Sequence, residues 1–207
     1  MIPGNPQLYS GELAQQLLRA FKFPDNVVSD NELEDYEMGG IALQNPFEGL
    51  EYQVWKGYWE AGSAYLTNDT LAAPVKIFDE PDVEEFCFTF DQNMRWAAAI
   101  RTKANLCKFL WYDSSVEAYV TTAISGVSSM RLTLDDKRHN QIQFGVSDVI
   151  LTTIEGGKVC WRIQRDRFGI LYSHPGSVSS RARITHFGLG ENMRLQWRIA
   201  SRRVKNG

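Results

Sequence analysis

Asp91-Gln92-Asn93-Met94-Arg95-Trp96 lies in the middle of the chain, and Gly190-Glu191-Asn192-Met193-Arg194-Leu195 near its end resembles it. An acidic residue stands two positions before Asn-Met-Arg in the first stretch and directly before it in the second. An apolar run typical of a β-strand follows each. Ser147-Asp148-Val149-Ile150-Leu151 opens a third such run without Asn-Met-Arg. The motif recurs at intervals of roughly 50 residues, a spacing found in β-propeller blades and related arrays. The sequence therefore predicts a mainly β protein of propeller-like, repeated antiparallel sheets, in which the motif marks the turn that opens each sheet.

The rest of the chain from residue 50 onward also has the alternating pattern of strands. Gly156 and Gly157 predict a tight hairpin turn, because glycine accepts positive φ at little cost. We expect a repeated β domain over residues 50–201, in which the last unit stops after one hairpin. Its strands are predicted at 51–59, 63–67, 75–78, 83–90, 95–101, 106–112, 119–124, 130–134, 149–154, 159–164, 181–187 and 193–200.

Residues 1–49 are expected to form a separate arm. Ser10 can cap a helix that runs to Phe23, and Pro24 ends it. Leu13, Leu17, Leu18 and Phe21 fall on one face of that helix. The apolar face can pack on the chain's own β domain or on a neighbouring subunit, and both alternatives remain open. An acidic connector with turns at Gly39-Gly40 and Asn45-Pro46 follows, and residues 202–207 form a short basic tail.

The charge of the chain is divided unevenly along its 207 residues. Residues 1–91 contain 17 Asp and Glu against 4 Lys and Arg, whereas residues 92–207 contain 8 against 18. The two parts therefore carry net charges of −13 and +10, although the whole chain carries only −3. Such halves can neutralise each other within a subunit or between subunits. A nucleic-acid surface is the competing interpretation, but the basic residues are scattered along strands.

No signature of catalysis, of cofactor binding or of metal binding is found in the sequence. Nucleophile elbows, metal-binding histidine motifs and phosphate loops are absent. The three histidines, at positions 139, 174 and 186, are interpreted as ordinary turn or sheet residues. Cys87, Cys107 and Cys160 form no CxxC pair, so we expect reduced, buried thiols. There is neither a signal peptide nor an apolar run of about 18 residues, and we therefore expect folding in a cytoplasm and no membrane partner.

Carboxylates recur at the ends of the strand-like runs, where they could serve structure or chemistry. In the structural interpretation they accept hydrogen bonds from turn amides and pair with nearby arginines. In the enzymatic alternative, two of them, such as Asp113 and Asp166, act as acid and base of a glycoside hydrolase. Because the positions are periodic, the structural interpretation is favoured. The set comprises Asp91, Asp113, Asp135, Asp136, Asp148, Asp166 and Glu191, together with Asn93, Met94, Arg95, Asn192, Met193 and Arg194 of the repeated motif.

The six tryptophans allow a second alternative, a sugar-binding platform, because aromatic rings stack on sugar faces. Five of them lie in alternating strands that must bury one face, so packing within or between sheets is the preferred interpretation. They are Trp55, Trp59, Trp96, Trp111, Trp161 and Trp197.

Five segments, in order along residues 80–170, resemble a group of tailed-bacteriophage virion proteins. They are Phe90-Asp91-Gln92-Asn93-Met94-Arg95, Leu110-Trp111-Tyr112-Asp113, Leu134-Asp135-Asp136-Lys137-Arg138, Ser147-Asp148-Val149-Ile150-Leu151 and Gln164-Arg165-Asp166-Arg167-Phe168. The resemblance implies a β-rich, non-enzymatic subunit of the tail or the head-to-tail connection, present in several copies in the virion after assembly in the host cytoplasm.

The expected partners are copies of the chain itself and other tail or connector proteins. No nucleic-acid contact is expected beyond DNA in a channel that the subunits line. The alternative functions are a receptor- or glycan-binding module of the tail and, third, a glycan hydrolase.

Overall fold

The computed structural model describes residues 39–44, 53–93, 95–135, 148–179, 181–189 and 195–201. Within these ranges the chain is mainly β, all strand pairs are antiparallel, and no α-helix is present. The mainly β, antiparallel fold predicted from the sequence is therefore confirmed. The predicted helix with Leu13, Leu17, Leu18 and Phe21 lies outside the described residues, as does the basic tail. In the part of the chain described here, no helix has the length and apolar character that a membrane span requires.

The strands form four sheets, each made of consecutive strands. Sheet 1 contains β1 (Gly39–Gln44), β2 (Gln53–Glu60), β3 (Ser63–Asn68) and β4 (Val75–Asp79). Sheet 2 contains β5 (Val83–Phe90), β6 (Trp96–Thr102), β7 (Leu106–Asp113) and β8 (Ala118–Ser125). Sheet 3 contains β9 (Val127–Asp135), β10 (Asp148–Glu155), β11 (Lys158–Ile163) and β12 (Tyr172–Ser177), with a 3-10 turn, η3 (Gln164–Asp166), before β12. Sheet 4 pairs β13 (Ala182–Leu189) with β14 (Leu195–Ser201).

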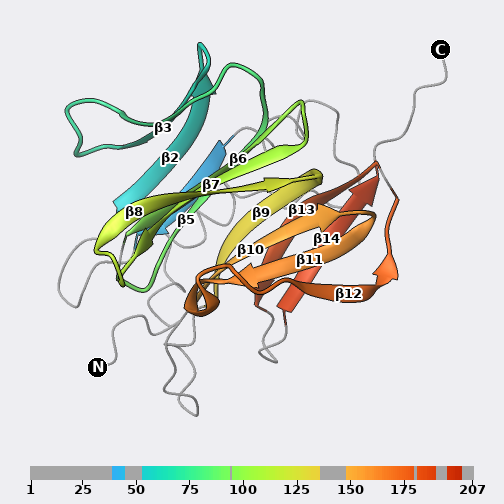
Figure 1. Ribbon diagram of the computed structural model, residues 1–207. Coiled ribbons are helices and arrows are strands. Elements are labelled where there is room, and N and C mark those ends of the chain that lie inside the picture. Colours follow the sequence, from blue (N-terminus) through green and yellow to red (C-terminus); the bar gives the residue numbers. More distant parts are fainter. Residues whose placement is uncertain are drawn as a thin grey trace, which may run out of the picture.

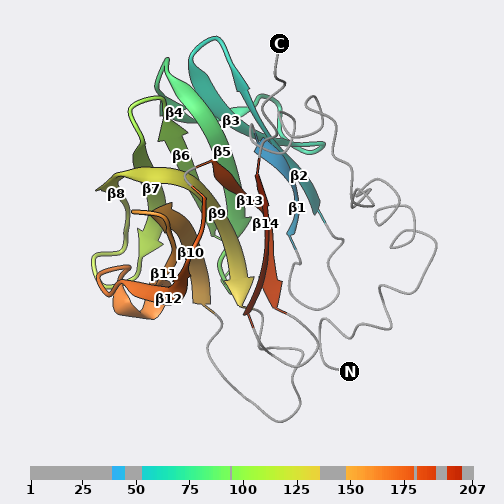
Figure 2. The same cartoon turned by 90° about the vertical axis from the view of Figure 1, so that its right-hand side faces the viewer.

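The sheets follow one another in space in the order of the sequence (Figure 1). The first strand of each sheet contacts the first strand of the next, so that β1 meets β5, β5 meets β9, and β9 meets β13. The fourth strands β4, β8 and β12 follow one another from top to bottom on the left of the rotated view (Figure 2). The described strands thus form a row of sheets stacked face to face.

The middle sheets are buried on both faces, and this explains their almost continuous apolar strands. In β6, Ala97 and Ala99 belong to the core between sheets 2 and 3, whereas Ala98 and Ile100 belong to the core between sheets 1 and 2. In β10, Leu151 faces sheet 2, whereas Ile150 and Ile154 pack with sheet 4. Since successive side chains of a strand point to opposite faces, one strand serves two cores.

Sheets 1 and 2 approach each other closely at Gly57. A Cβ at this position would lie 2.6 Å from Cε1 of Phe88, a side chain that is 8% exposed. Glycine in β2 therefore allows the aromatic core of sheet 2 to reach the backbone of sheet 1.

The boundaries of the units differ from those predicted. Asp91 does not open a sheet but stands in the turn between β5 and β6, and Asp148 begins β10 after β9. The repeated motif therefore marks the junction of a first and a second strand. The prediction failed because β5 and β6 pair across the Asp91 turn as a hairpin, while the real boundary between sheets 2 and 3 is the single residue Gly126, at φ 78°.

Sheet 1 also begins earlier than expected. Gly39 and Gly40, interpreted as a turn in the acidic connector, start β1, which pairs with β2 from Gly39 opposite Tyr58 to Gln44 opposite Gln53. Glycine is uncommon inside strands, so the sequence pattern conceals this one.

Candidate functional site

Asp91 organises the turn between β5 and β6. Its Oδ1 accepts hydrogen bonds from the backbone amides of Asn93 at 2.8 Å and Arg95 at 2.9 Å, and Nε of Arg95 donates to Oδ2 at 3.2 Å. The carboxylate side chain is 4% exposed, whereas the Arg95 side chain is 29% exposed and lies over the ring of Tyr112, with Cζ 4.0 Å from the ring centroid. An aspartate here therefore fixes the turn and orients an arginine.

Asp148 has the same role at the corresponding junction of sheet 3. Its Oδ1 accepts from the backbone amide of Arg165 at 3.1 Å, and Nε of Arg165 donates to Oδ2 at 2.7 Å. Nη2 of the same guanidinium also contacts Oδ2, so the ion pair is bidentate on the arginine side. This contact attaches η3 to the start of β10.

Asp113, at the end of β7, connects sheet 2 to sheet 3. Nε and Nη2 of Arg167 donate to its Oδ2 at 3.0 and 2.6 Å, while Oδ1 accepts from the amide of Ser115 at 2.9 Å and its hydroxyl at 2.7 Å. Hydrogen bonds from Ser115 and the Arg167 guanidinium hold the pKa of Asp113 below its usual value, although burial opposes this shift. The acidic group is thus kept ionised.

The backbone after η3 places Arg167 and Phe168 by an uncommon conformation. Both residues are left-handed, with φ of 50° and 56°. Such conformations cost free energy in residues other than glycine and persist where the surroundings fix them. Here the fixing contact is the Phe168 ring, which is 3% exposed and meets Phe109 and Trp111 of sheet 2 with centroid distances of 4.4 and 5.0 Å.

The remaining predicted positions do not join this arrangement. Asp166 accepts a hydrogen bond from the hydroxyl of Tyr172 at 2.9 Å and does not line the pocket described below. Asp135 ends β9, where its backbone pairs with Asp148. Met94, Asp136, Glu191, Asn192, Met193 and Arg194 lie outside the described residues.

The three ion pairs surround one pocket of about 330 Å³, at the end of sheets 2 and 3 where their turns meet. Its walls come from the β5–β6 turn, the end of β7, the start of β10 and η3. The lining includes three carboxylates and three arginines, namely Asp91, Asp113, Asp148, Arg95, Arg165 and Arg167. Four of these, Asp91, Arg95, Asp113 and Asp148, are among the predicted structural residues. The sequence places Arg165 and Arg167 on either side of Asp166, whereas in the structure their partners are Asp148 and Asp113.

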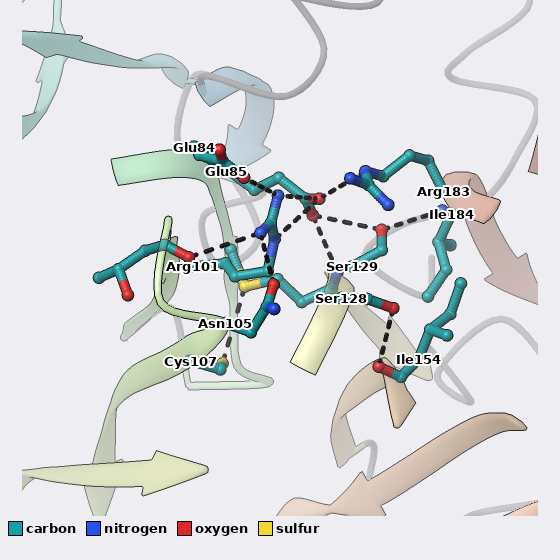
Figure 3. Close-up of polar contacts among 12 residues, drawn as sticks. Glu84, Glu85, Arg101, Asn105, Cys107, Ser128, Ser129, Ile154, Arg183 and Ile184 are labelled. Atoms are coloured by element: carbon teal, nitrogen blue, oxygen red, sulfur yellow. Dashed lines mark hydrogen bonds and ion pairs between the residues drawn. The ribbon is translucent and has the colours of Figure 1, made fainter. Parts of the chain in front are cut away.

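A second charged cluster, which the sequence did not predict, lies among the first strands of sheets 2, 3 and 4 (Figure 3). Its centre is Glu85 on β5, which is 0% exposed. Oε1 accepts from Nε of Arg101 at 3.1 Å, and Oε2 accepts from the Met130 amide at 2.9 Å and the Ser129 hydroxyl at 3.2 Å. The same hydroxyl accepts from the amide of Ile184 at 3.0 Å, so the cluster links β5, β9 and β13.

Two further arginines face Glu85 from neighbouring sheets. Nη1 of Arg131 lies 3.4 Å from Oε2, and Nε of Arg183 lies 3.5 Å from Oε1. Arg101 is also paired with Glu84, whose Oε2 lies 2.8 Å from Nη2. The only sequence signal for this cluster is the presence of single charged residues inside apolar strands, which does not reveal which charges meet.

The cysteines and tryptophans have the structural roles that the sequence predicts. All three cysteines are free and buried, and desolvation raises the pKa of the Cys87 thiol to about 12. Every tryptophan belongs to or packs against one of the three cores between sheets. His174 is exposed and accepts a hydrogen bond from the Gly176 amide, while His139 and the side chain of His186 lie outside the described residues.

No metal-binding group of three or more His, Cys, Asp or Glu side chains is found within the described ranges. Comparison of the chain with protein-family models, with curated proteins and with solved structures gives no match.

Proposed function

We propose that this chain is a non-enzymatic structural subunit of a tailed-bacteriophage virion, present in several copies in the tail or the head-to-tail connection. The observation that carries the proposal is the use of the recurring carboxylates. Asp91, Asp113 and Asp148 are each 4% exposed or less and are each held by an arginine. Groups held in this way join turns and sheets. They support the interpretation of the repeated motif as a scaffold, within a chain whose motifs resemble those of virion proteins.

The arrangement of the sheets adds support. We infer a propeller-like array, because four-stranded sheets of consecutive strands stack with their first strands adjacent, as blades do. In the described residues β14 pairs only with β13, and strand addition at a sheet edge is one way in which we propose that subunits assemble. Other copies of this chain or other tail proteins are the partners that we propose, with the arm of residues 1–49 as an additional contact.

The hydrolase alternative is disfavoured by electrostatics. A glycosidase needs one carboxyl group with a raised pKa to protonate the leaving oxygen. At Asp113 the hydrogen bonds from Ser115 and Arg167 lower the pKa. The glycan platform of tryptophans is disfavoured by packing, since all six rings contribute to the cores between sheets.

The proposal is tested on particles. A tagged copy of the chain, produced together with the phage that encodes it, is expected to co-purify with intact virions through a density gradient. A matched chain with Leu13 and Leu17 changed to Asp is expected to fold but to enter particles less often. Failure of the tagged wild-type chain to enter particles would contradict the proposal, whereas equal entry of both chains would remove only the role of the arm.

A further inference from the structure

In the pocket between sheets 2 and 3, the acidic side chains are more deeply buried than the basic ones. The side chains of Asp91, Asp113 and Asp148 are 3–4% exposed, whereas those of Arg95, Arg165 and Arg167 are 29%, 54% and 63% exposed. A molecule that enters therefore meets guanidinium donors, while the carboxylates lie behind them. We propose that this pocket binds the oxyanion group of a small molecule, a carboxylate or a phosphate ester, through Arg95 and Arg167.

Both arginines retain donors for a ligand. Arg95 uses Nε for Asp91, and no acceptor among the described residues meets its two Nη atoms. Arg167 uses Nε and Nη2 for Asp113, and its Nη1 likewise has no acceptor in the described part of the chain. A guanidinium presents planar pairs of N–H groups that match the oxygen atoms of carboxylate and phosphate.

The donors are also held in place before a ligand arrives. Asp113 fixes the Arg167 guanidinium by accepting two hydrogen bonds from it. The buried ring of the following residue, Phe168, fixes the backbone beside Arg167. Asp91 and the ring of Tyr112 restrict Arg95 in the same way. Groups that are already ordered lose less conformational entropy on binding, so binding to them is favoured.

The size and charge of the pocket define the ligand class. A volume of about 330 Å³ is at the lower end of the range for small-molecule sites, roughly 300–1,000 Å³. Three carboxylates balance three arginines in the lining, so long-range attraction is weak and recognition depends on short hydrogen bonds. Ser114 and Ser115 line the same pocket. A sugar acid or a sugar phosphate, with one oxyanion and several hydroxyls, fits this chemistry.

Isothermal titration calorimetry on the full chain tests the inference, with sodium glucuronate, sodium phosphate and glucose as probes. Glucuronate or phosphate is expected to bind at least tenfold more tightly than glucose. Phosphate binding alone would assign the site to phosphate, and glucuronate binding alone would assign it to sugar acids. Equal binding of glucose, or no binding of either anion, would overturn the proposal.

Variants locate the site. Arg167→Gln and Arg95→Gln are each expected to weaken anion binding at least tenfold, whereas Arg181→Gln, an exposed arginine that does not line the pocket, is expected to leave it unchanged. Two pocket variants are used so that the loss of one to misfolding, detected by its melting curve, leaves the other informative. Unchanged binding in a folded pocket variant would overturn the assignment. Because the titration uses the isolated chain, its result does not depend on the proposed role in the virion.

Discussion

The Glu85 carboxylate on β5 accepts a hydrogen bond from Nε of Arg101 on β6 at 3.1 Å, with both side chains 2% exposed or less. The same carboxylate meets β9 through Ser129 and Met130, and β13 through Arg183. A buried charge network of this kind joins three sheets at their first strands. Substitutions within it should therefore destabilise the contacts between these sheets.

Glu85→Gln is expected to lower the free energy of unfolding by about 3 to 5 kcal/mol, because Arg101, Arg131 and Arg183 lose the buried carboxylate that they share and Arg101 keeps only the partly exposed Glu84. Glu84→Gln is the matched control, because the Glu84 side chain is next to Glu85 in the sequence, is 41% exposed and pairs with the same Arg101. Its effect should be smaller, because Arg101 keeps its ion pair with Glu85 and the Glu84 carboxylate is partly exposed to water. Urea denaturation followed by tryptophan fluorescence measures both. Equal losses of unfolding free energy in the two variants would show that Glu85 contributes no more to stability than Glu84.

The Asp113–Arg167 ion pair predicts a dependence of stability on pH. The pKa of Asp113 is lowered in the folded chain from its usual 3.8. The folded state therefore gains stability above the unfolded pKa, and this gain is lost as the pH falls through the folded pKa. Asp113→Asn should melt below the wild type at pH 7, and the difference should shrink below pH values of about 4. A difference that grows toward acid pH would contradict the assigned direction.

Phe168 is expected to anchor η3 to sheet 2 by packing. Phe168→Ala removes a ring that is 3% exposed and contacts Phe109 and Trp111. The expected loss is about 3 to 5 kcal/mol, the usual cost of removing a buried phenylalanine ring. Leu171→Ala, at a side chain that is 50% exposed, is the control, with an expected change within about 0.5 kcal/mol. Chemical denaturation of both variants gives the comparison, and a small effect at Phe168 would argue against the anchor.

The turn between β2 and β3 offers a stabilising substitution. Ala61 and Gly62 both have positive φ, 50° and 81°, as a two-residue type I′ hairpin turn requires. Asparagine accepts this conformation more readily than alanine, so Ala61→Asn should raise the free energy of unfolding by about 1 kcal/mol. Ala72→Asn, at an exposed alanine without positive φ, should not stabilise the chain. Thermal melts measure both changes, and a loss of stability at Ala61 would refute the assignment of the turn.

Most strands were predictable from the sequence because alternation and turn residues are local signals, but β1 and β12 were not predicted. The hairpin β10–β11 around Gly156 and Gly157 formed as predicted, with Glu155 opposite Lys158. Of the recurring carboxylates, Asp91, Asp113 and Asp148 accept hydrogen bonds from backbone amides and arginines, whereas Asp166 accepts one from Tyr172. The sheet boundaries were not predicted, because a hairpin turn at Asp91 and a sheet boundary at Gly126 both interrupt an alternating pattern.

The contacts between sheets could not be predicted, since they join residues far apart in the sequence. Arg167 lies 54 positions from Asp113, and Met130 lies 45 positions from Glu85. Nothing local selects these partners over the nearer Asp166 or Glu84. Phe168 resembles an ordinary apolar residue until its left-handed backbone and its contact with Trp111 are seen.

If a phage encodes this chain, as we propose, quantitative mass spectrometry of that phage's purified particles tests the proposed structural role most directly. A structural subunit of the tail or the connector should be present in several copies per virion and in a fixed ratio to the other tail proteins. That ratio should persist when the particles are repurified at high salt. Absence of the chain from infectious particles whose other tail proteins are all detected would contradict the account.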